Sequence, residues 1–336
     1  MGFKWGIVGC GNIADNNFIP ALKMARGAVI SAVTDTDGNR AKLLAEKHGL
    51  DKCFADFDTL IKDKDIDAVY IATPNKFHCE QVIKAAQNGK HILCEKPMAI
   101  SAAECDAMLK ACSKYGVKLM IGYMSRFQPA ILEAKRLITT GAIGSTGVVC
   151  GYFSFIFPEN LFHLWRMNKE VSGGGCMMDI GVYLLNTLRF MVGAKEISVI
   201  SRSENGRGIA CEIFSSSILT YENGVRGMIE CNFKTALRSG FEIRGSTGSI
   251  FAEHVFERGT PAKLTLHKGE GHEKIQDFSF DEINPYQKEI EYFAECIKLD
   301  KEPEIGSGQE GLLDIKAINA IYKSSSYKQG KEIKIS

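Results

Sequence analysis

The chain has 336 residues, 45% of them hydrophobic and 24% charged, with a formal net charge of +1. This length predicts two domains, and the balanced charge argues against nucleic acid or a membrane surface as a partner. The sequence lacks a long uninterrupted apolar run and enters a strand-like segment at once, so we expect a cytoplasmic protein without a membrane span or signal peptide.

The first segment predicts a strand, a glycine-rich turn and a helix. Apolar residues 5–8 lead into Gly9-x-Gly11-x-x-Ala14, and a helical pattern follows. In a dinucleotide site the first glycine permits a tight turn, the second lets the backbone approach the pyrophosphate, and the small third residue lets helix and strand pack closely. The motif therefore predicts a nicotinamide dinucleotide site, and the alternative is an ordinary strand-turn-helix.

A carboxylate follows the next expected strand, residues 29–34. Asp35 lies about 20 residues beyond Ala14, the spacing at which an acidic residue accepts hydrogen bonds from the adenosine ribose. An aspartate there repels a 2′-phosphate, so we expect NAD, with NADP as the alternative because Arg40 is close in sequence. Asp35 could also be an ordinary turn residue, since Asp37-Gly38 follows it.

The rest of the first half alternates helix and strand. Helices are expected at 39–48, 58–62, 75–88 and about 101–115, the last opened by a capping box of Ser101 and Glu104. Strands are expected at 67–72, 91–94 and 117–122. This alternation predicts a Rossmann-type, doubly wound parallel sheet, which binds its ligand beyond the carboxyl ends of the strands.

Three loops follow strands at that edge and carry candidate binding residues. A Glu-Lys-Pro sequence follows one strand, and its Lys96 would bring an ammonium to the place expected for the nicotinamide. Ordinary explanations stay open: Asn75 as a helix N-cap and Lys96 as a solvated surface residue. The candidates in the three loops are Thr73, Pro74, Asn75, Glu95, Lys96 and Arg126.

From about residue 126 the pattern changes to long strand-like runs. We expect helices at 129–138, 285–299 and about 309–324, and strands at 147–157, 209–221, 225–233, 241–244 and 249–253. Asn223-Gly224 is a strong hairpin signal between two of these strands. Short turns predict a mostly antiparallel sheet, so the expected domains are 1–124 and 125–336.

Within the second domain, Gly173-Gly174-Gly175 precedes an apolar helical stretch. Asp179 and Tyr183 are four residues apart and would share one face of that helix. A carboxylate and a phenol on an apolar helix are costly to bury without partners. A buried tyrosine whose hydroxyl bonds the aspartate or the backbone stays open as an explanation.

The eleven cysteines are odd in number and include no C-x-x-C pair. Several lie in apolar surroundings, so reduced, mostly buried thiols are the simplest interpretation. Neither cysteines nor histidines show ligand spacing, and we expect no metal site.

Five motifs occur in one order along the chain: G-C-G-N-I-A, A-T-P-N-K-F-H, E-K-P, G-Y-M-S-R-F and G-G-G-x-x-x-D-I-G-V-Y. Over nearly its whole length the chain resembles the glucose-fructose oxidoreductase, inositol dehydrogenase and rhizopine-catabolism family (Gfo/Idh/MocA). The resemblance implies a C-terminal α+β domain with a large open, mostly antiparallel sheet that binds the substrate. It also implies a homodimer or homotetramer formed through that sheet.

The resemblance assigns roles by position. Lys96 and Tyr183 would form the catalytic acid-base pair, and Asp179 would orient a sugar hydroxyl. Expected cofactor-binding residues are Gly9, Gly11, Asn12, Ile13, Asp35, Arg40, Thr73, Pro74, Asn75, His78, Glu95, Lys96, Arg126, Trp165 and Arg166. Expected substrate-binding residues are Lys96, Arg126, Phe155, Asp179 and Tyr183.

Tyr183 departs from the inositol dehydrogenase pattern, which has histidine at this position. Tyrosine occurs there in the glucose-fructose oxidoreductase, xylose dehydrogenase and dihydrodiol dehydrogenase branches, so the resemblance implies an aldose, a glycoside or a related vicinal diol. A phenol has an ordinary pKa near ~10, and an adjacent ammonium favours its ionised form, which makes a usable base.

Three alternatives remain open. One is an oxidoreductase that keeps its nicotinamide and acts on the 3-hydroxyl of a glycoside or shuttles hydride between two sugars. Another is a reductase of a carbonyl metabolite, which would use the same residues in the opposite direction. The third belongs to a different class: a non-catalytic regulator that senses the nucleotide.

Overall fold

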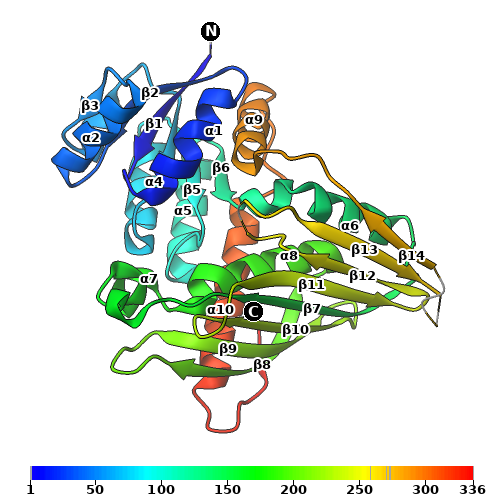
Figure 1. Cartoon of the computed structure of the whole chain (residues 1–336). Helices are drawn as coiled ribbons and strands as arrows, with labels where there is room; N and C mark the ends of the chain where they lie inside the picture. Colours follow the sequence, from blue (N-terminus) through cyan, green and yellow to red (C-terminus); the bar gives the residue numbers. More distant parts are fainter. Residues whose placement is uncertain (1, 258, 270, 272–273, 336) are drawn as a thin grey trace. The chain divides into compact units, whose positions relative to one another are not determined.

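The computed structural model describes residues 2–257, 259–269, 271 and 274–335. These residues form two compact units, each with its own sheet (Figure 1). Unit 1 comprises Met1–Phe127 and Asn284–Leu312, and unit 2 comprises Gln128–Ile283 and Leu313–Ser336. The sequence-based domains 1–124 and 125–336 are each continuous, whereas unit 1 includes a segment from late in the chain.

Unit 1 contains a six-stranded parallel sheet in the order β3-β2-β1-β4-β5-β6. The strands are β1 Phe3–Val8, β2 Ala28–Thr34, β3 Cys53–Phe54, β4 Ala68–Ile71, β5 His91–Glu95 and β6 Leu119–Gly122. The helices are η1 Ala14–Phe18, α1 Ile19–Met24, α2 Gly38–His48, α3 Phe57–Lys62, η2 Asn75–Phe77, α4 His78–Gln87, α5 Ala102–Tyr115, η3 Met124–Phe127 and α9 Pro285–Lys298. The predicted doubly wound parallel sheet is confirmed.

Aromatic side chains fill the core of unit 1. Helices cover both faces of a parallel sheet, so its central strands are continuous apolar runs, and all of β4 is buried. Tyr70 stacks on Phe18 with ring centroids 3.5 Å apart, and Trp5 meets Phe18 edge-on. Phe293 of α9 joins this cluster, and burying such a side chain contributes roughly 1.5–3 kcal/mol. This packing explains why α9 belongs to unit 1.

Unit 2 contains a nine-stranded sheet in the order β14-β13-β12-β11-β7-β10-β9-β8-β15. The strands are β7 Thr146–Ser154, β8 Glu196–Asn205, β9 Glu212–Tyr221, β10 Arg226–Asn232, β11 Arg238–Gly245, β12 Gly248–Glu253, β13 Lys263–Lys268, β14 Lys274–Phe278 and β15 Ile333–Lys334. β7 and β10 pair parallel, while the other described pairs are antiparallel, which confirms the predicted sheet type. At the predicted hairpin Gly224 has a φ of 85°, which glycine adopts without strain.

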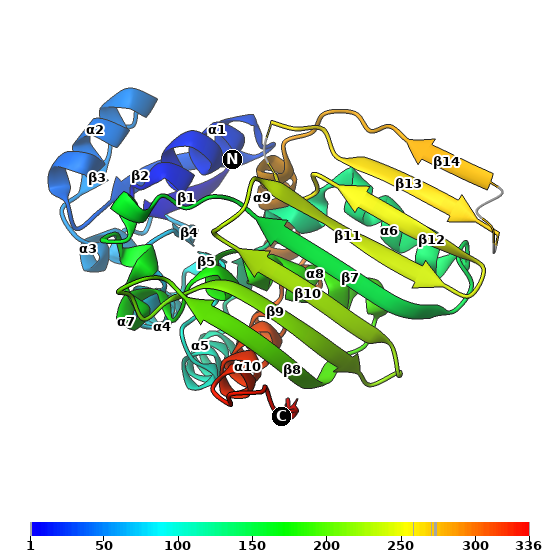
Figure 2. The ribbon, with the colours of Figure 1, turned by 60° about the horizontal axis from the view of Figure 1, so that its bottom comes forward.

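Helices cover one face of this sheet and leave the other open. The helices of unit 2 are α6 Pro129–Thr139, η4 Glu159–Leu161, η5 Trp165–Met167, α7 Lys169–Ser172, η6 Met177–Gly181 and α8 Val182–Val192; α10 Gly308–Ser325 begins in unit 1 and continues into unit 2. α8 packs on β7, and α6 packs on α8 and β12. Figure 2 shows the opposite face, on which no helix of the described chain lies.

A buried ion network ties two of these helices to the sheet. Arg189 of α8 donates from Nε to Glu196 of β8 at 2.7 Å and from Nη1 to Asp314 of α10 at 2.6 Å. Asn186 donates to the second oxygen of Asp314 at 3.1 Å. A buried arginine with two carboxylate partners makes strong, directional bonds, so the network fixes how α10 packs in unit 2.

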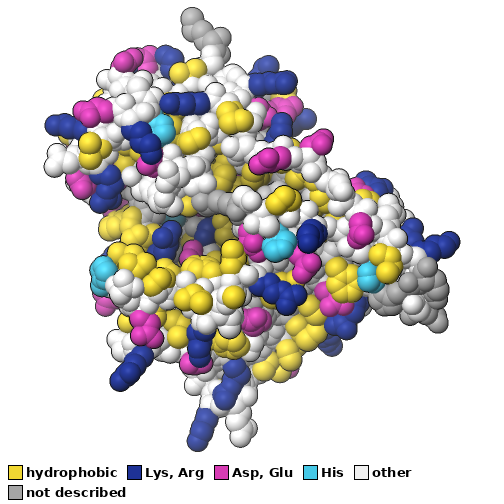
Figure 3. Space-filling model, in the orientation of Figure 1, with side chains coloured by type: hydrophobic (Ala, Val, Ile, Leu, Met, Phe, Trp, Pro, Cys, Tyr) yellow, Lys and Arg dark blue, Asp and Glu magenta, His cyan; other side chains and the backbone are white. Residues whose placement is uncertain are grey.

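None of the helices in the described parts of the chain combines the length and apolar character needed to cross a membrane. Across the same residues, no cluster of three or more His, Cys, Asp and Glu side chains is arranged to hold a metal ion. On the face drawn in Figure 3, basic and acidic side chains are interspersed, in keeping with the net charge of +1.

Candidate functional site

The glycine turn after β1 has the shape a dinucleotide needs. Gly9 has a φ of 93°, and a Cβ there would lie 2.7 Å from the Ala72 carbonyl oxygen, so the position requires glycine. A Cβ built on Gly11 meets no atom within 4 Å, which leaves space beside this backbone. Asn12 is exposed and Ile13 is half-buried at the start of the following helix. The turn therefore fits a pyrophosphate at a helix N-terminus.

Asp35 is bonded to the same turn. Its Oδ2 accepts from the Cys10 N–H at 2.8 Å, and its Oδ1 accepts from the Asp37 N–H at 2.9 Å. Arg40 Nη1 lies 3.6 Å from Oδ2, and the Arg40 side chain is exposed. Burial raises the pKa of the Cys10 thiol to about 12, and Asp35 adds to that rise. The turn role considered for Asp35 is thus present, and its ribose contact stays a prediction.

His78 connects two of the predicted loops. Its ring nitrogens lie 2.9 Å from the Thr73 carbonyl oxygen and 3.0 Å from that of Pro97, and the side chain is fully buried. Burial lowers the pKa of His78, so the neutral ring is favoured and donates to one carbonyl. The neighbouring Lys96–Pro97 peptide bond is cis, and Asn75 is buried at the start of η2. His78 therefore links the loop that contains Thr73 to the loop that contains Pro97.

Glu95 is positioned by a tyrosine that sequence analysis did not identify. Tyr70 donates its hydroxyl to Glu95 Oε1 at 2.5 Å, and burial raises the pKa of Tyr70 well above its usual value, which keeps it a neutral donor. Gly122 of β6 lies beside the same oxygen: a Cβ built there would lie 3.4 Å from it, an ordinary contact distance. Lys96 follows and is half-buried. The sequence offered one signal for this role: Tyr70 is the only residue with a polar side-chain group in the apolar strand β4.

Arg126 has a structural partner within unit 1. Arg126 is 2% exposed, and its Nη1 donates to Glu310 Oε1 at 2.9 Å. Glu310 Oε2 also accepts the N–H groups of Gly306 and Ser307, which caps α10. Arg126 thus anchors the start of this helix, and its contact with cofactor or substrate stays a prediction.

In unit 2, Asp179 and Tyr183 follow the triple glycine. Asp179 lies in a π-helical turn, η6, and is half-buried; Tyr183 lies in the first turn of α8 and is 7% exposed. The wider π turn replaces the regular α-helix expected there, and such turns are frequent at functional sites. Phe153 and Phe256 flank the Tyr183 ring at centroid distances of 6.3 and 6.0 Å.

The other predicted residues of unit 2 lie in an aromatic region after β7. Phe155 is half-buried, donates its N–H to the Asn232 carbonyl at 3.1 Å and packs on Phe233 with ring centroids 4.9 Å apart. Trp165 and Arg166 lie in η5, with the guanidinium 5.2 Å from the indole ring. The Trp165 and Arg166 side chains are both half-buried.

The predicted residues therefore form two groups. Unit 1 brings together the glycine turn, Asp35 and the loops around Thr73, Glu95 and Lys96. Unit 2 contains Asp179, Tyr183, Phe155, Trp165 and Arg166, and Phe153 lies beside the Tyr183 ring. Two further side chains belong to this region, and the sequence did not point to either of them: Glu212 accepts the Gly175 N–H, and Tyr322 donates its hydroxyl to Glu212.

Comparisons with known proteins match both units. Residues 3–123 match the family described as "Oxidoreductase family, NAD-binding Rossmann fold" (GFO_IDH_MocA). Residues 131–251 match the "GFO/IDH/MocA C-terminal domain". The oxidoreductase function and the NAD(P) cofactor expected from the sequence are confirmed at the level of the family.

Individual relatives extend along most of the chain. A D-xylose 1-dehydrogenase [NADP(+)] from Haloarcula marismortui is 34% identical and covers 77% of this chain and 72% of its own. A trans-1,2-dihydrobenzene-1,2-diol dehydrogenase from Bos taurus is 28% identical and covers 89% of each. The crystal structure of an aldose-aldose oxidoreductase from Caulobacter crescentus, complexed with glycerol, is 28% identical, has a TM-score of 0.91 and covers 99% of this chain and 100% of its own. The chain belongs to the GFO/IDH/MocA family of NAD-binding oxidoreductases.

Proposed function

We propose that this oxidoreductase transfers hydride between nicotinamide C4 and a sugar or a sugar-like vicinal diol. The proposal rests on a feature common to the compounds named for the relatives, which are xylose, a dihydrodiol and an aldose. In each compound, a carbon that bears a hydroxyl group is bonded to a second oxygen or to another carbon that bears oxygen. A substrate with neighbouring oxygen atoms would also use both proposed residues of unit 2, with Tyr183 at the reacting hydroxyl and Asp179 at another hydroxyl.

When bound, NAD(P) would supply or accept the hydride. The turn at Gly9 and Gly11 would hold its pyrophosphate, since backbone N–H groups at a helix start favour an anion. Asp35 would accept hydrogen bonds from the ribose hydroxyls. It would favour NAD over NADP, because its carboxylate repels the negatively charged 2′-phosphate of NADP. Its bond to the Cys10 N–H keeps the carboxylate beside the turn.

Lys96 and Tyr183 would handle the proton. Oxidising an alcohol removes a hydride from carbon and a proton from oxygen, and the phenolate of Tyr183 is the proposed acceptor. The ammonium of Lys96 would stabilise that phenolate and donate to the reacting oxygen as it gains negative charge. In the reverse direction the Tyr183 hydroxyl would protonate the carbonyl.

Asp179 would fix the pose of the substrate. Its carboxylate is half-buried rather than enclosed, and a carboxylate accepts hydrogen bonds from sugar hydroxyls. Holding the alcohol carbon in a reactive orientation lowers the entropic part of the barrier.

The test is nicotinamide absorbance of dialysed protein given a panel of aldoses, polyols, glycosides and diols, with NAD and NADP in separate wells. Steady reduction with one substrate class, faster with NAD, is the expected result. Absence of any reduction or oxidation across the panel, with cofactor demonstrably bound, would contradict the proposal.

One relative favours a second candidate. Its name, aldose-aldose oxidoreductase, denotes transfer between two sugars. In that version the chain would retain its nicotinamide through dialysis, and one sugar would reduce it before another reoxidises it. Retained cofactor, together with an absorbance change limited to about one equivalent per chain until a second sugar is added, distinguishes this reaction from the first.

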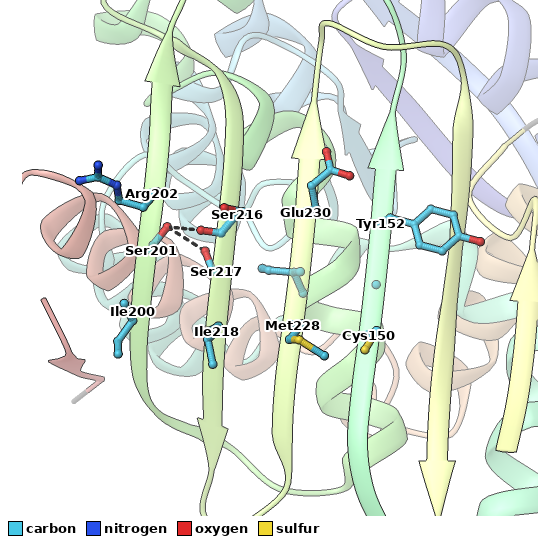
Figure 4. A pocket seen from close by; sticks show the side chains of 12 residues that line it. Cys150, Tyr152, Ile200, Ser201, Arg202, Ser216, Ser217, Ile218, Met228 and Glu230 are labelled. Atoms are coloured by element: carbon cyan, nitrogen blue, oxygen red, sulfur yellow. Dashed lines mark hydrogen bonds between the residues drawn. The ribbon is translucent and has the colours of Figure 1, made fainter. Parts of the chain in front are cut away.

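We also propose that two copies pair through the open face of the unit 2 sheet. Ile200, Ile218, Met228 and Cys150 form one row across four adjacent strands, and the first three are 42, 54 and 41% exposed. The row lines a hollow of about 500 Å³ (Figure 4). A polar row beside it includes Arg202 and Glu230, which complement each other in charge in a symmetric pair. A homodimer, or a tetramer that contains it, would cover these side chains.

We place the protein in the cytoplasm because of its cysteines. None of the eleven forms a disulfide bond, and eight of them are buried. A compartment that keeps thiols reduced suits this usage. Labelling of the native protein with a thiol reagent should modify the exposed Cys53 and leave the buried thiols unreacted until unfolding.

A further inference from the structure

The triple glycine before Asp179 is held by a carboxylate from a distant strand. Glu212 is the first residue of β9 and is 4% exposed. Its Oε2 accepts the Gly175 N–H at 2.9 Å, and its Oε1 accepts the Met177 N–H at 2.9 Å. These are donors in the first turn of a helix, where N–H groups lack partners and a negative charge is favoured.

A tyrosine completes the arrangement from the other side. Tyr322 of α10 donates its hydroxyl to Glu212 Oε1 at 2.9 Å. All three partners of Glu212 donate, so its two oxygens act only as acceptors, as an ionised carboxylate does. Burial raises the pKa of Glu212, while the bonds from Met177 and Gly175 oppose that rise.

The glycines let these groups approach. A Cβ on Gly174 would overlap the Tyr322 hydroxyl, and a Cβ on Gly175 would overlap the Glu212 carbonyl. Because both Cβ positions are taken by Glu212 and Tyr322, the glycines are explained by this contact within unit 2. The groups that lie against the triple glycine are therefore parts of the protein itself.

The hydrogen bonds of Glu212 connect it, through Gly175, to Asp179, the residue proposed to orient the substrate. Gly175 donates its N–H to Glu212 and accepts the Asp179 N–H on its carbonyl at 3.0 Å. Met177, the other donor to Glu212, is the first residue of the π turn that contains Asp179. Tyr183 follows in the first turn of α8, which continues from that π turn.

We propose that Glu212 and Tyr322 are positioning residues, which lock the triple-glycine turn so that Asp179 and Tyr183 keep the orientation the reaction requires. This inference rests on the proposed function of Asp179 and Tyr183. Neither Glu212 nor Tyr322 touches the substrate in this account, and both act through the backbone of residues 175–177.

Glu212→Gln tests the inference because it keeps the size and removes one accepting oxygen. We expect kcat to fall about 10- to 100-fold and the sugar KM to rise, while the Kd for NAD changes less than twofold. Tyr322→Phe keeps both N–H bonds to Glu212, so its kcat should fall only about two- to fivefold. Both assays are run well below the unfolding temperature of each variant.

Glu196→Gln is the matched control. Glu196 is also 4% exposed and also lies at the start of a strand of the same sheet, but it bonds Arg189 rather than the glycine turn. The control should lose thermal stability yet keep kcat within about twofold. Equal losses of kcat in Glu212→Gln and Glu196→Gln would overturn the positioning role.

Hydrogen exchange provides a readout that does not depend on turnover. The amide protons of Gly175 and Met177 should exchange at least about tenfold faster in Glu212→Gln than in the parent chain, with the Rossmann segments unchanged. Unchanged exchange there, or faster exchange with normal kcat in both variants, overturns the inference. A parent chain that binds NAD but converts no substrate overturns the proposed function itself, and the positioning role with it.

Discussion

Two side chains, Lys96 and Tyr183, carry the proposed acid-base chemistry. We expect Lys96→Ala and Tyr183→Phe each to lower kcat by about 100-fold or more, the size of a lost acid-base contribution. The Kd for NAD should change little, because the pyrophosphate and ribose contacts proposed for the glycine turn and Asp35 remain. Stopped-flow turnover and equilibrium cofactor titration measure the two quantities.

Two substitutions of the same kind serve as controls. Lys118→Ala removes the ion pairs with Asp300 and Glu302, and Tyr152→Phe removes a hydroxyl on the open face of the unit 2 sheet. Both should retain near-normal turnover. Near-normal turnover in Lys96→Ala or Tyr183→Phe would show that the acid-base pair is assigned to the wrong residues.

The sequence predicted single residues best where a backbone rule applies. Gly9 requires a positive φ, and the predicted glycine indeed has one. Ser101 accepts the Glu104 N–H as a capping box demands. By contrast, Glu95 is bonded by Tyr70, and Gly175 is bonded by Glu212, which Tyr322 bonds in turn. In each pair the two residues lie 25 or more positions apart in the chain. Spacing rules describe local geometry and cannot identify such partners.

At the scale of elements, α9 brings a carboxyl into the core of unit 1. Glu289 is fully buried, and neither of its oxygens has a hydrogen-bond partner among the described residues. Burial raises the pKa of Glu289 well above its usual value, and the nearby Glu95 adds to the rise. The group is therefore neutral in the folded chain at pH values where it ionises in the unfolded chain.

Glu289→Gln should stabilise the protein increasingly as pH rises. The stability that the raised pKa provides is complete below the unfolded value, near ~4.3, and is lost as pH rises toward the folded value. The free energy of unfolding of the parent should therefore fall relative to the variant by up to about 1.4 kcal/mol per pH unit in that window. Urea unfolding at pH 5, 6 and 7 measures this difference.

Glu291→Gln on the same helix is the control of opposite sign. Burial acts to raise the pKa of Glu291, but bonds from Gln287, the Arg26 N–H and Lys288 outweigh it, and the pKa is lowered. The stability that ionised Glu291 provides is lost only as pH falls below the pKa of this group in the unfolded chain. The change in unfolding free energy caused by Glu291→Gln should therefore be constant from pH 5 to 7. A constant effect for Glu289→Gln as well would contradict a buried neutral carboxyl.

The elements predicted from sequence were those with continuous apolar runs or clear caps. The strands β8, β13 and β14 were missed because polar and charged residues interrupt their apolar residues, which leaves no continuous apolar run. In β8 the first residue, Glu196, is charged and yet buried, because it bonds Arg189. The π turn was missed because its composition is that of an ordinary apolar helix. Assignment of α9 to unit 1 depends on its packing against α1, which no local pattern reveals.

At the scale of the whole molecule, the open sheet face predicts self-association. Ile218 lies at the centre of the apolar row and is 54% exposed, so a carboxylate there would be buried in the proposed pair. Ile218→Asp should convert a dimer or tetramer to a monomer in sedimentation experiments at micromolar concentration, because an unpaired buried charge is strongly unfavourable.

Leu43→Asp provides the comparison. Leu43 is 66% exposed on α2 of unit 1, so the same change in charge should leave the assembly intact. A monomeric parent chain, or an Ile218→Asp variant that sediments like the parent, would contradict pairing through this face.

Isotope transfer follows the proposed hydride itself from the sugar or diol carbon to the nicotinamide. The substrate found in the panel is prepared with deuterium on the reacting carbon and incubated with the protein and NAD(P). The account predicts one deuterium at nicotinamide C4 of the reduced cofactor, detected by NMR, with the label strongly diminished in Tyr183→Phe. Reduced cofactor without deuterium, or label transfer undiminished in that variant, would contradict the account.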